Sequence, residues 1–94
     1  MNIDEIAKLN YEWVEKMGWH NKTVLEALAL VASEVGEAIN ECRNESPTDA
    51  LGEELADIVL RVLDIAHWQG ISLEKEIVLK MKKNDQRGSR GRLK

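Results

Sequence analysis

The segment LGEELADIVLRVLDIAHWQ, residues 51–69, constrains the fold more than any other part of this 94-residue chain. Its apolar residues recur at helical spacing, on one long stripe and on a second, nearly adjacent stripe that includes Val59, Leu63 and Ala66. A helix that is apolar around so much of its circumference has to be buried on more than one side. A single chain of this size offers little such shelter, so we expect a second subunit to cover the remainder.

Two helices are predicted before this segment. Residues 3–17 carry one apolar stripe, and Gly18 stops the helix. A capping box formed by Thr23 and Glu26 opens a second helix, which we expect to run to about residue 43.

Two further start signals complete the helical pattern. The residues SPTD (46–49) predict that the third helix starts here, with Ser46 as its cap and Pro47 at its first position. Ser72 predicts the cap of a fourth helix that ends near Asn84. Because no segment shows strand-like alternation, we predict an all-α fold of four helices, with the bundle completed by homo-oligomerisation.

Composition places this chain among globular proteins with a single domain. Hydrophobic residues make up 44% of the sequence and charged residues 32%. The one cysteine, Cys42, has no partner for an internal disulfide, and the longest apolar run, ALALVA, is far too short to span a membrane. We therefore expect a cytoplasmic protein without membrane association. Residues 1–87 are expected to form one helical domain, and residues 88–94 a basic, flexible tail.

The charge of the chain is unevenly distributed. The formal net charge is −4, but seven Lys and Arg residues and a single acid follow from Lys80 onward, which leaves the rest of the chain strongly acidic. An acidic body disfavours nonspecific attraction to nucleic acid, so no specific nucleic-acid binding is expected. The basic end is compatible with a solvated terminus or with contacts to phosphate groups.

Paired carboxylates mark the second and third helices. The second carries Glu34-x-x-Glu37 and the third carries Glu54-x-x-Asp57, with Glu53 beside it. A spacing of three puts each pair on one helix face. If the two helices are antiparallel neighbours, each close pair would repel by about 4 kcal/mol at a separation of ~4 Å and an effective dielectric near 20. A divalent cation removes this repulsion, and an all-oxygen site favours Mg²⁺ or Mn²⁺ over Zn²⁺.

Alternative explanations of the acids were weighed on the same residues. An isolated ExxE motif is usually a solvated helix face, but two such motifs beside strongly apolar stripes favour a metal site. Gly36 costs a helix about 1 kcal/mol relative to Ala, and either an approaching ligand or close helix packing explains its presence. A ferritin-like di-iron centre needs Glu-x-x-His on two helices, and only Asp64-x-x-His67 approaches that pattern.

Three stretches, SEVGEAINE, GEELADIVLRVLDIA and KMKKNDQR, resemble in order and spacing the MazG-like nucleoside triphosphate pyrophosphohydrolases. These enzymes belong to the all-α NTP pyrophosphatase superfamily, and the resemblance spans roughly Trp19 to Arg87. It implies that Mg²⁺, held by paired acids, binds the triphosphate and a water that attacks phosphorus, releasing a nucleoside monophosphate and pyrophosphate. By resemblance the metal ligands are Glu34, Glu37, Glu54 and Asp57.

The resemblance also assigns roles to other polar residues. The fourth-helix pattern of the family falls on Lys80, Asn84 and Arg87, which lie on one helix face and would counter the charge of the triphosphate. Solvated surface charge is the alternative for each of the three alone. Glu37 or Glu53 is expected to act as the catalytic base.

The segment GWHNKT (18–23) resembles the part of related enzymes that contacts the nucleobase. Trp19 would stack on a base, and His20 or Asn21 would read its edge. Trp13, on the apolar stripe of the first helix, is expected in the core.

Two positions further along the third helix complete the expected site. Arg61 and Asp64 extend its acidic face and would either pair with each other or line the site, and Arg61 is a candidate substrate-binding residue. Many relatives have a third acid immediately before the first motif, where this chain has Ser33, so the number of metal ions is left open.

The leading hypothesis is Mg²⁺-dependent hydrolysis of (deoxy)nucleoside triphosphates by a homodimer or homotetramer, an activity suited to clearing unwanted nucleotides. A second hypothesis keeps the superfamily but changes the substrate to dUTP, dCTP or phosphoribosyl-ATP. A third, from another class, is a helical oligomerisation or regulatory module without activity. Intact acids at all four expected positions favour an active site.

Overall fold

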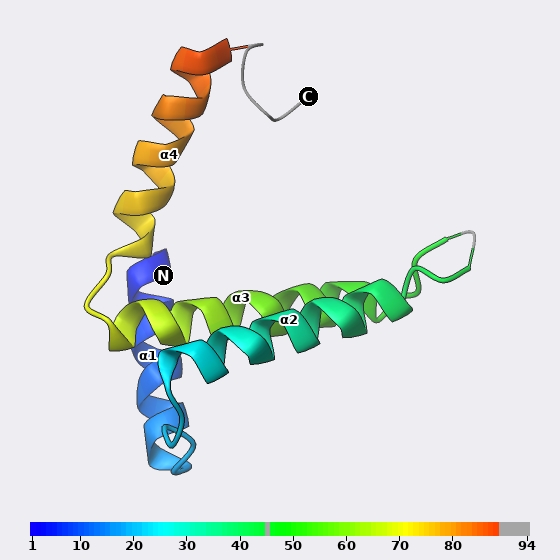
Figure 1. The fold of residues 1–94 in the computed structure, drawn as a ribbon, viewed down its shortest axis with the longest axis horizontal. Coiled ribbons are helices and arrows are strands. Elements are labelled where there is room, and N and C mark those ends of the chain that lie inside the picture. Colours follow the sequence, from blue (N-terminus) through cyan, green and yellow to red (C-terminus); the bar gives the residue numbers. More distant parts are fainter. Residues whose placement is uncertain (45, 89–94) are drawn as a thin grey trace.

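The computed structural model describes residues 1–44 and 46–88, which form four α-helices. They are α1 (Ile3–Lys16), α2 (Val24–Asn40), α3 (Leu51–Trp68) and α4 (Leu73–Arg87). Helices α2 and α3 lie side by side and antiparallel as one arm (Figure 1). Helix α1 crosses this arm at the end where α2 begins and α3 ends, and α4 departs from the same end (Figure 1). The predicted all-α architecture is confirmed.

The core lies where α3 packs against α1 and α2, and it is small. Leu63 and Ala66 of α3 are buried, together with Ala7 of α1 and Ala38 of α2. Two members of the second apolar stripe of α3 are thus core residues, but the third, Val59, is 52% exposed. The short side chains of the three alanines allow the helices to approach closely, at the cost of little buried apolar area.

Large apolar side chains remain exposed along the arm and on α4. On the arm they include Leu25, Leu28, Ile39, Leu55 and Val59, and on α4 Val78, Leu79 and Met81. A single copy of the chain therefore leaves unburied much of what its sequence offers for burial. Homo-oligomerisation stays a prediction that would cover these residues. None of the helices in the described part of the chain has the length and apolarity needed to cross a membrane.

The N-termini of the first two helices follow their sequence signals. Thr23 and Glu26 form the predicted capping box at α2, since the Thr23 side chain accepts from the Glu26 amide and the Glu26 carboxylate accepts from the Thr23 amide. Helix α1 ends as predicted near Gly18, whose φ of +75° suits glycine. Helix α2 ends at Asn40, slightly earlier than expected.

The predicted start of α3 is wrong. Ser46 does not cap this helix, which begins at Leu51 without a side-chain capping hydrogen bond. Instead, the Thr48 amide donates to the carbonyl oxygen of Glu41 at 3.0 Å, and the Thr48 hydroxyl bonds the Glu41 carboxylate. Because these contacts hold Thr48 against the end of α2, they override the local start signal and the helix starts later.

Helix α4 is attached to α1 through its first turn. Ser72 caps α4 as predicted, and its hydroxyl donates to Oδ2 of Asp4 at 2.5 Å, while the Glu74 amide donates to Oδ1 of Asp4 at 3.3 Å. Beyond this junction α4 extends away from the arm to Arg87, about one turn past its predicted end (Figure 1). Apart from Gly88, the predicted tail lies outside the described residues.

Candidate functional site

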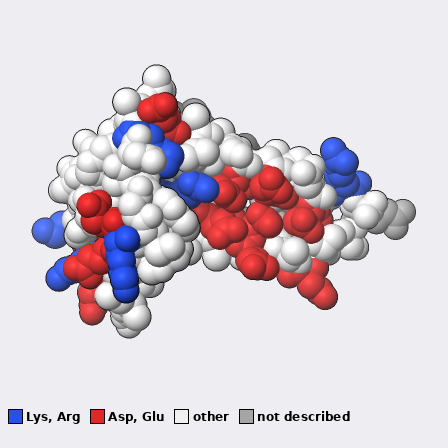
Figure 2. All heavy atoms as spheres, turned by 90° about the horizontal axis from the view of Figure 1, so that it is seen from below, with Lys and Arg blue, Asp and Glu red and all other residues white. Residues whose placement is uncertain are grey.

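The antiparallel packing of α2 and α3 brings acidic residues of the two motifs together. Glu34, Glu54 and Asp57 each offer a carboxylate oxygen, and these oxygens all lie within 4.8 Å of one another. Figure 2 shows that acidic side chains cover one face of the arm as a continuous band. The cluster therefore joins residues far apart in the sequence, as the two motifs predicted.

The acids of this cluster disfavour one another's charge. Burial, and next to it the charge of Asp57, raises the pKa of the Glu54 carboxyl above its ordinary value, with further contributions from Glu37, Glu34 and Glu41. All donors in the group are carboxylate oxygens, the ligand type that Mg²⁺ prefers. The residues present therefore fit a divalent cation.

Two acids with predicted roles lie outside the 4.8 Å group. Glu37 is exposed on α2, close enough for its charge to raise the pKa of Glu54. Glu53 is exposed on α3. Neither arrangement tests which of the two acts as a base, and that role stays a prediction.

Arg61 neutralises part of the cluster. Its Nε donates to Oε1 of Glu34 at 2.9 Å, across from α3 to α2, and the two side chains are 42% and 18% exposed. Of the two arrangements expected for Arg61 and Asp64, lining the site is the one observed, because each pairs with a different partner. Arg61 thus places a cation directly beside the candidate metal ligands.

A pocket of about 590 Å³ opens beside the cluster, between the arm, α1 and the residue 17–23 connection. Glu34, Asp57 and Arg61 line it near the acids, and all three tryptophans of the chain line it as well. The expectation that Trp13 lies in the core is wrong, since its side chain is 51% exposed. Trp13 instead meets Trp19 edge to face, with ring centroids 5.2 Å apart.

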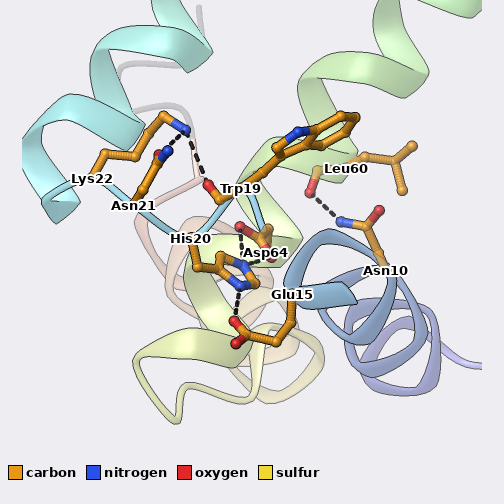
Figure 3. A network of polar contacts seen from close by, with 8 residues as sticks. All are labelled: Asn10, Glu15, Trp19, His20, Asn21, Lys22, Leu60 and Asp64. Carbon is orange, nitrogen blue, oxygen red and sulfur yellow. Dashed lines mark hydrogen bonds and ion pairs between the residues drawn. The ribbon is translucent and has the colours of Figure 1, made fainter. Parts of the chain in front are cut away.

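The connection between α1 and α2 is fixed by polar contacts (Figure 3). Nδ1 of His20 lies 2.6 Å from a carboxylate oxygen of Glu15, and Nε2 lies 2.8 Å from Oδ1 of Asp64. Lys22 donates to the carbonyl oxygen of Trp19 and to the side-chain oxygen of Asn21. His20 and Trp19 therefore reach the pocket as predicted, while Asn21 is engaged with its neighbour.

Three residues of this region were missed by sequence reasoning. Asn10 lines the pocket and donates to the carbonyl oxygen of Leu60 at 3.0 Å, Lys22 lines the pocket, and Glu15 holds His20. Each is a single polar residue outside any motif, on a helix face or in a connection, so its sequence carries no signal of the site.

The basic residues predicted on the fourth helix lie elsewhere in one copy of the chain. Lys80, Asn84 and Arg87 belong to the part of α4 that points away from the arm, and none of the three lines the pocket (Figure 1). A single chain does not bring them to the acids, and their role as phosphate-binding residues stays a prediction.

Comparison with known proteins adds a family to this geometry. A search of curated proteins and a search of solved structures each give no match. The family model described as MazG nucleotide pyrophosphohydrolase domain matches residues 21–90, which include both motif-bearing helices and α4. The acid cluster and most of the pocket fall within the matched residues. The chain therefore belongs to the MazG nucleotide pyrophosphohydrolase domain family.

Proposed function

We propose that this chain hydrolyses (deoxy)nucleoside triphosphates to the monophosphate and pyrophosphate in a Mg²⁺-dependent reaction. The observation that carries the proposal is the direct adjacency of the three clustered acids, Glu34, Glu54 and Asp57, to a pocket that also holds aromatic rings and a cation. Such a site can receive an anionic group at one part and a flat ring at another. Clearing unwanted nucleotides is a role that suits this activity.

The acids are the metal-binding part of the proposed site. Glu34, Glu54 and Asp57 hold Mg²⁺, or Mn²⁺ in its place, and Glu37 completes the ligand set from the next turn of α2. When bound, the ion supplies charge neutralisation for the phosphates and lowers the pKa of the attacking water. Glu37 or Glu53 accepts the proton of that water.

The remaining pocket residues bind the nucleotide. Arg61 lies between Glu34 and the pocket, so its guanidinium can bind a phosphate oxygen bidentately once the acids have another counterion. Trp19 offers an exposed ring for stacking on the nucleobase. His20 contributes to the same wall of the pocket.

Homo-oligomerisation, as a dimer or tetramer, would complete the site. The exposed apolar residues of the arm and of α4 need a cover, and a second copy offers matching apolar faces. Helix α4 carries Lys80, Asn84 and Arg87, while the arm of another copy presents the acidic band. This charge complementarity supports an assembly in which α4 of one copy reaches the phosphates bound by another.

The test is pyrophosphate release from a panel of ribo- and deoxynucleoside triphosphates, with Mg²⁺, with Mn²⁺ and with chelator. We expect metal-dependent release of pyrophosphate together with a monophosphate product. The panel includes dUTP, dCTP and phosphoribosyl-ATP, so it also separates the alternative substrates. Glu37→Gln should abolish turnover in a folded protein, whereas Glu12→Gln, an exposed acid of α1, should leave it unchanged.

Two outcomes would overturn the proposal. Release of orthophosphate in place of pyrophosphate would assign a different reaction. Absence of turnover across the panel, from folded protein that Mg²⁺ does not stabilise, would favour a helical assembly module without activity.

A further inference from the structure

His20 lies in the connection between α1 and α2, yet it is tied to two other elements. Its side chain is 13% exposed, between Glu15 of α1 and Asp64 of α3 (Figure 3). One ring face stacks on Tyr11 of α1, with centroids 4.3 Å apart and planes 25° apart. A surface histidine in a loop has no need of three such contacts, so this arrangement calls for a functional explanation.

The two carboxylates decide the protonation state of His20. Nδ1 lies 2.6 Å from Glu15 Oε1, and Nε2 lies 2.8 and 3.1 Å from the two oxygens of Asp64. A carboxylate only accepts hydrogen bonds, and a neutral imidazole donates through one nitrogen alone. Both contacts are hydrogen bonds only if both nitrogens carry protons, so the geometry requires the imidazolium form.

The other charged and titratable groups around the ring are compatible with this form. His67 of α3 meets the Tyr11 ring that stacks on His20, with centroids 4.8 Å apart, and Lys22 is engaged with Trp19 and Asn21. Desolvation lowers the pKa of His20, but the hydrogen bonds from Asp64 and Glu15 outweigh it, and the pKa is raised above 6.5.

The residue before His20 shows what the bridge holds in place. The Trp19 amide donates to the Val14 carbonyl at 3.1 Å, where α1 ends, and the Trp19 ring meets Trp13 edge to face. The Trp19 side chain is 49% exposed and lines the pocket. Its position there depends on the course of a short connection that, between the ends of α1 and α2, is anchored to α3 through His20.

We propose that His20 is a positioning residue, which as an imidazolium bridges Glu15 and Asp64 and thereby fixes Trp19 as the wall of the pocket that receives the nucleobase. His20 then acts on the base through Trp19, because both of its ring nitrogens are occupied. Loss of the ring proton removes the donor to one carboxylate, so the bridge opens and nucleotide binding weakens as pH rises through the pKa of His20. The inference rests on the proposed function only for the identity of the ligand.

The first test follows the bridge without any substrate. Ring resonances of the two histidines are titrated by NMR, and the protection of the Trp19 amide against hydrogen exchange is measured on both sides of the transition. We expect His20 to titrate above 6.5, and Asp64→Asn and Glu15→Gln each to lower its pKa. In His20→Gln, protection of the Trp19 amide should fall about tenfold, a factor matching the loss of one hydrogen bond to a charged group.

The second test uses turnover of the best nucleotide substrate. KM for wild type should rise about tenfold across the His20 transition while kcat, at saturating substrate, does not follow that transition; this is the split expected when an interaction of binding is lost. In His20→Gln, KM should be high at all pH values and no longer follow the transition. His67→Gln is the matched control and should keep the wild-type KM profile, since its ring contacts the same tyrosine but no carboxylate in the described residues.

The outcomes separate this inference from the proposed function. Absence of turnover on every nucleotide would refute the function, while the exchange and NMR measurements would still decide whether the bridge exists. If His20→Gln fails to fold, Glu15→Gln replaces it, because the Glu15 side chain is 63% exposed, with Glu12→Gln as its control. Unchanged Trp19 protection and unchanged KM in a folded variant, or loss of kcat with KM intact, would overturn the positioning role.

Discussion

Arg61 of α3 and Glu34 of α2 form an ion pair across the arm, with Nε 2.9 Å from Oε1. Glu34 is also a member of the 4.8 Å acid group. The guanidinium therefore occupies one lone-pair position of a candidate metal ligand, and it does so at the border of the pocket. A cation entering the cluster and Arg61 compete for the same carboxylate, which couples the metal site to the phosphate-binding side of the pocket.

Replacing Arg61 with Gln should expose this competition. Because the pair is partly exposed, we expect the chelated protein to lose no more than about 1 kcal/mol of its free energy of unfolding. The rise in melting temperature on adding Mg²⁺ should be larger than in wild type, since Glu34 no longer shares its charge. Thermal unfolding in chelator and in Mg²⁺ measures both, with Lys8→Gln on α1 as the control. A smaller response to Mg²⁺ in Arg61→Gln than in wild type would contradict the competition.

Replacing Glu54 with Gln should stabilise the metal-free protein. Burial and the neighbouring charges disfavour the ionised form of Glu54, so its pKa is raised and a neutral amide of the same shape relieves the repulsion. The same change should remove most of the stabilisation by Mg²⁺, because a ligand is lost. Urea unfolding with and without Mg²⁺ checks both effects. A variant less stable than wild type in chelator would indicate that Glu54 is needed for the fold itself.

Stability of the α1–α4 junction should depend on pH through Asp4. The hydrogen bond from Ser72 is the largest effect on the Asp4 carboxyl, and its pKa lies below the ordinary 3.8. Because the folded state favours the charged form, the contribution of Asp4 is complete above pH ~4 and is lost as pH falls through its lowered pKa. The difference in urea midpoint between wild type and Asp4→Ala should therefore shrink in acid. A difference that stays constant down to the acid limit would show that Asp4 acts through packing.

Replacing Val59 with Lys should disrupt the proposed assembly. Val59 is 52% exposed on α3 in one copy, so the substitution costs an isolated chain little, whereas an apolar interface does not accept an unpaired ammonium. Sedimentation velocity should show a shift to monomer and, if α4 of another copy contributes to the site, a loss of turnover. Met17→Lys, at the end of α1, is the control. An assembly that survives Val59→Lys would place the interface elsewhere.

Several elements could be predicted from the sequence because their signals are local. The capping box at Thr23, the cap at Ser72 and the glycine that ends α1 each act within one turn of the chain. The acid cluster was predictable for a related reason, since i, i+3 spacing fixes a helix face and a short connection makes α2 and α3 antiparallel neighbours.

The rest depends on contacts between distant residues. The start of α3 is set by Thr48 against Glu41, and the environment of His20 is set by Asp64, which is 44 positions away. Trp13 has the spacing of a core residue, but only the crossing of α1 over α3 decides whether that stripe is covered. No pattern in a single sequence reports such pairings, since their energy comes from side chains that meet only in the folded chain.

The three tryptophans of this chain, Trp13, Trp19 and Trp68, all line one pocket, and Trp is absent from α2 and α4. Intrinsic fluorescence of the protein is therefore an optical report on that pocket, and the far end of the arm is spectroscopically silent. A ligand that enters should change the emission without any label. For the same reason, an unfolding curve followed by fluorescence records the junction of α1 with α3, while circular dichroism records all four helices. A gap between the two curves would measure how independently the binding end of the molecule opens.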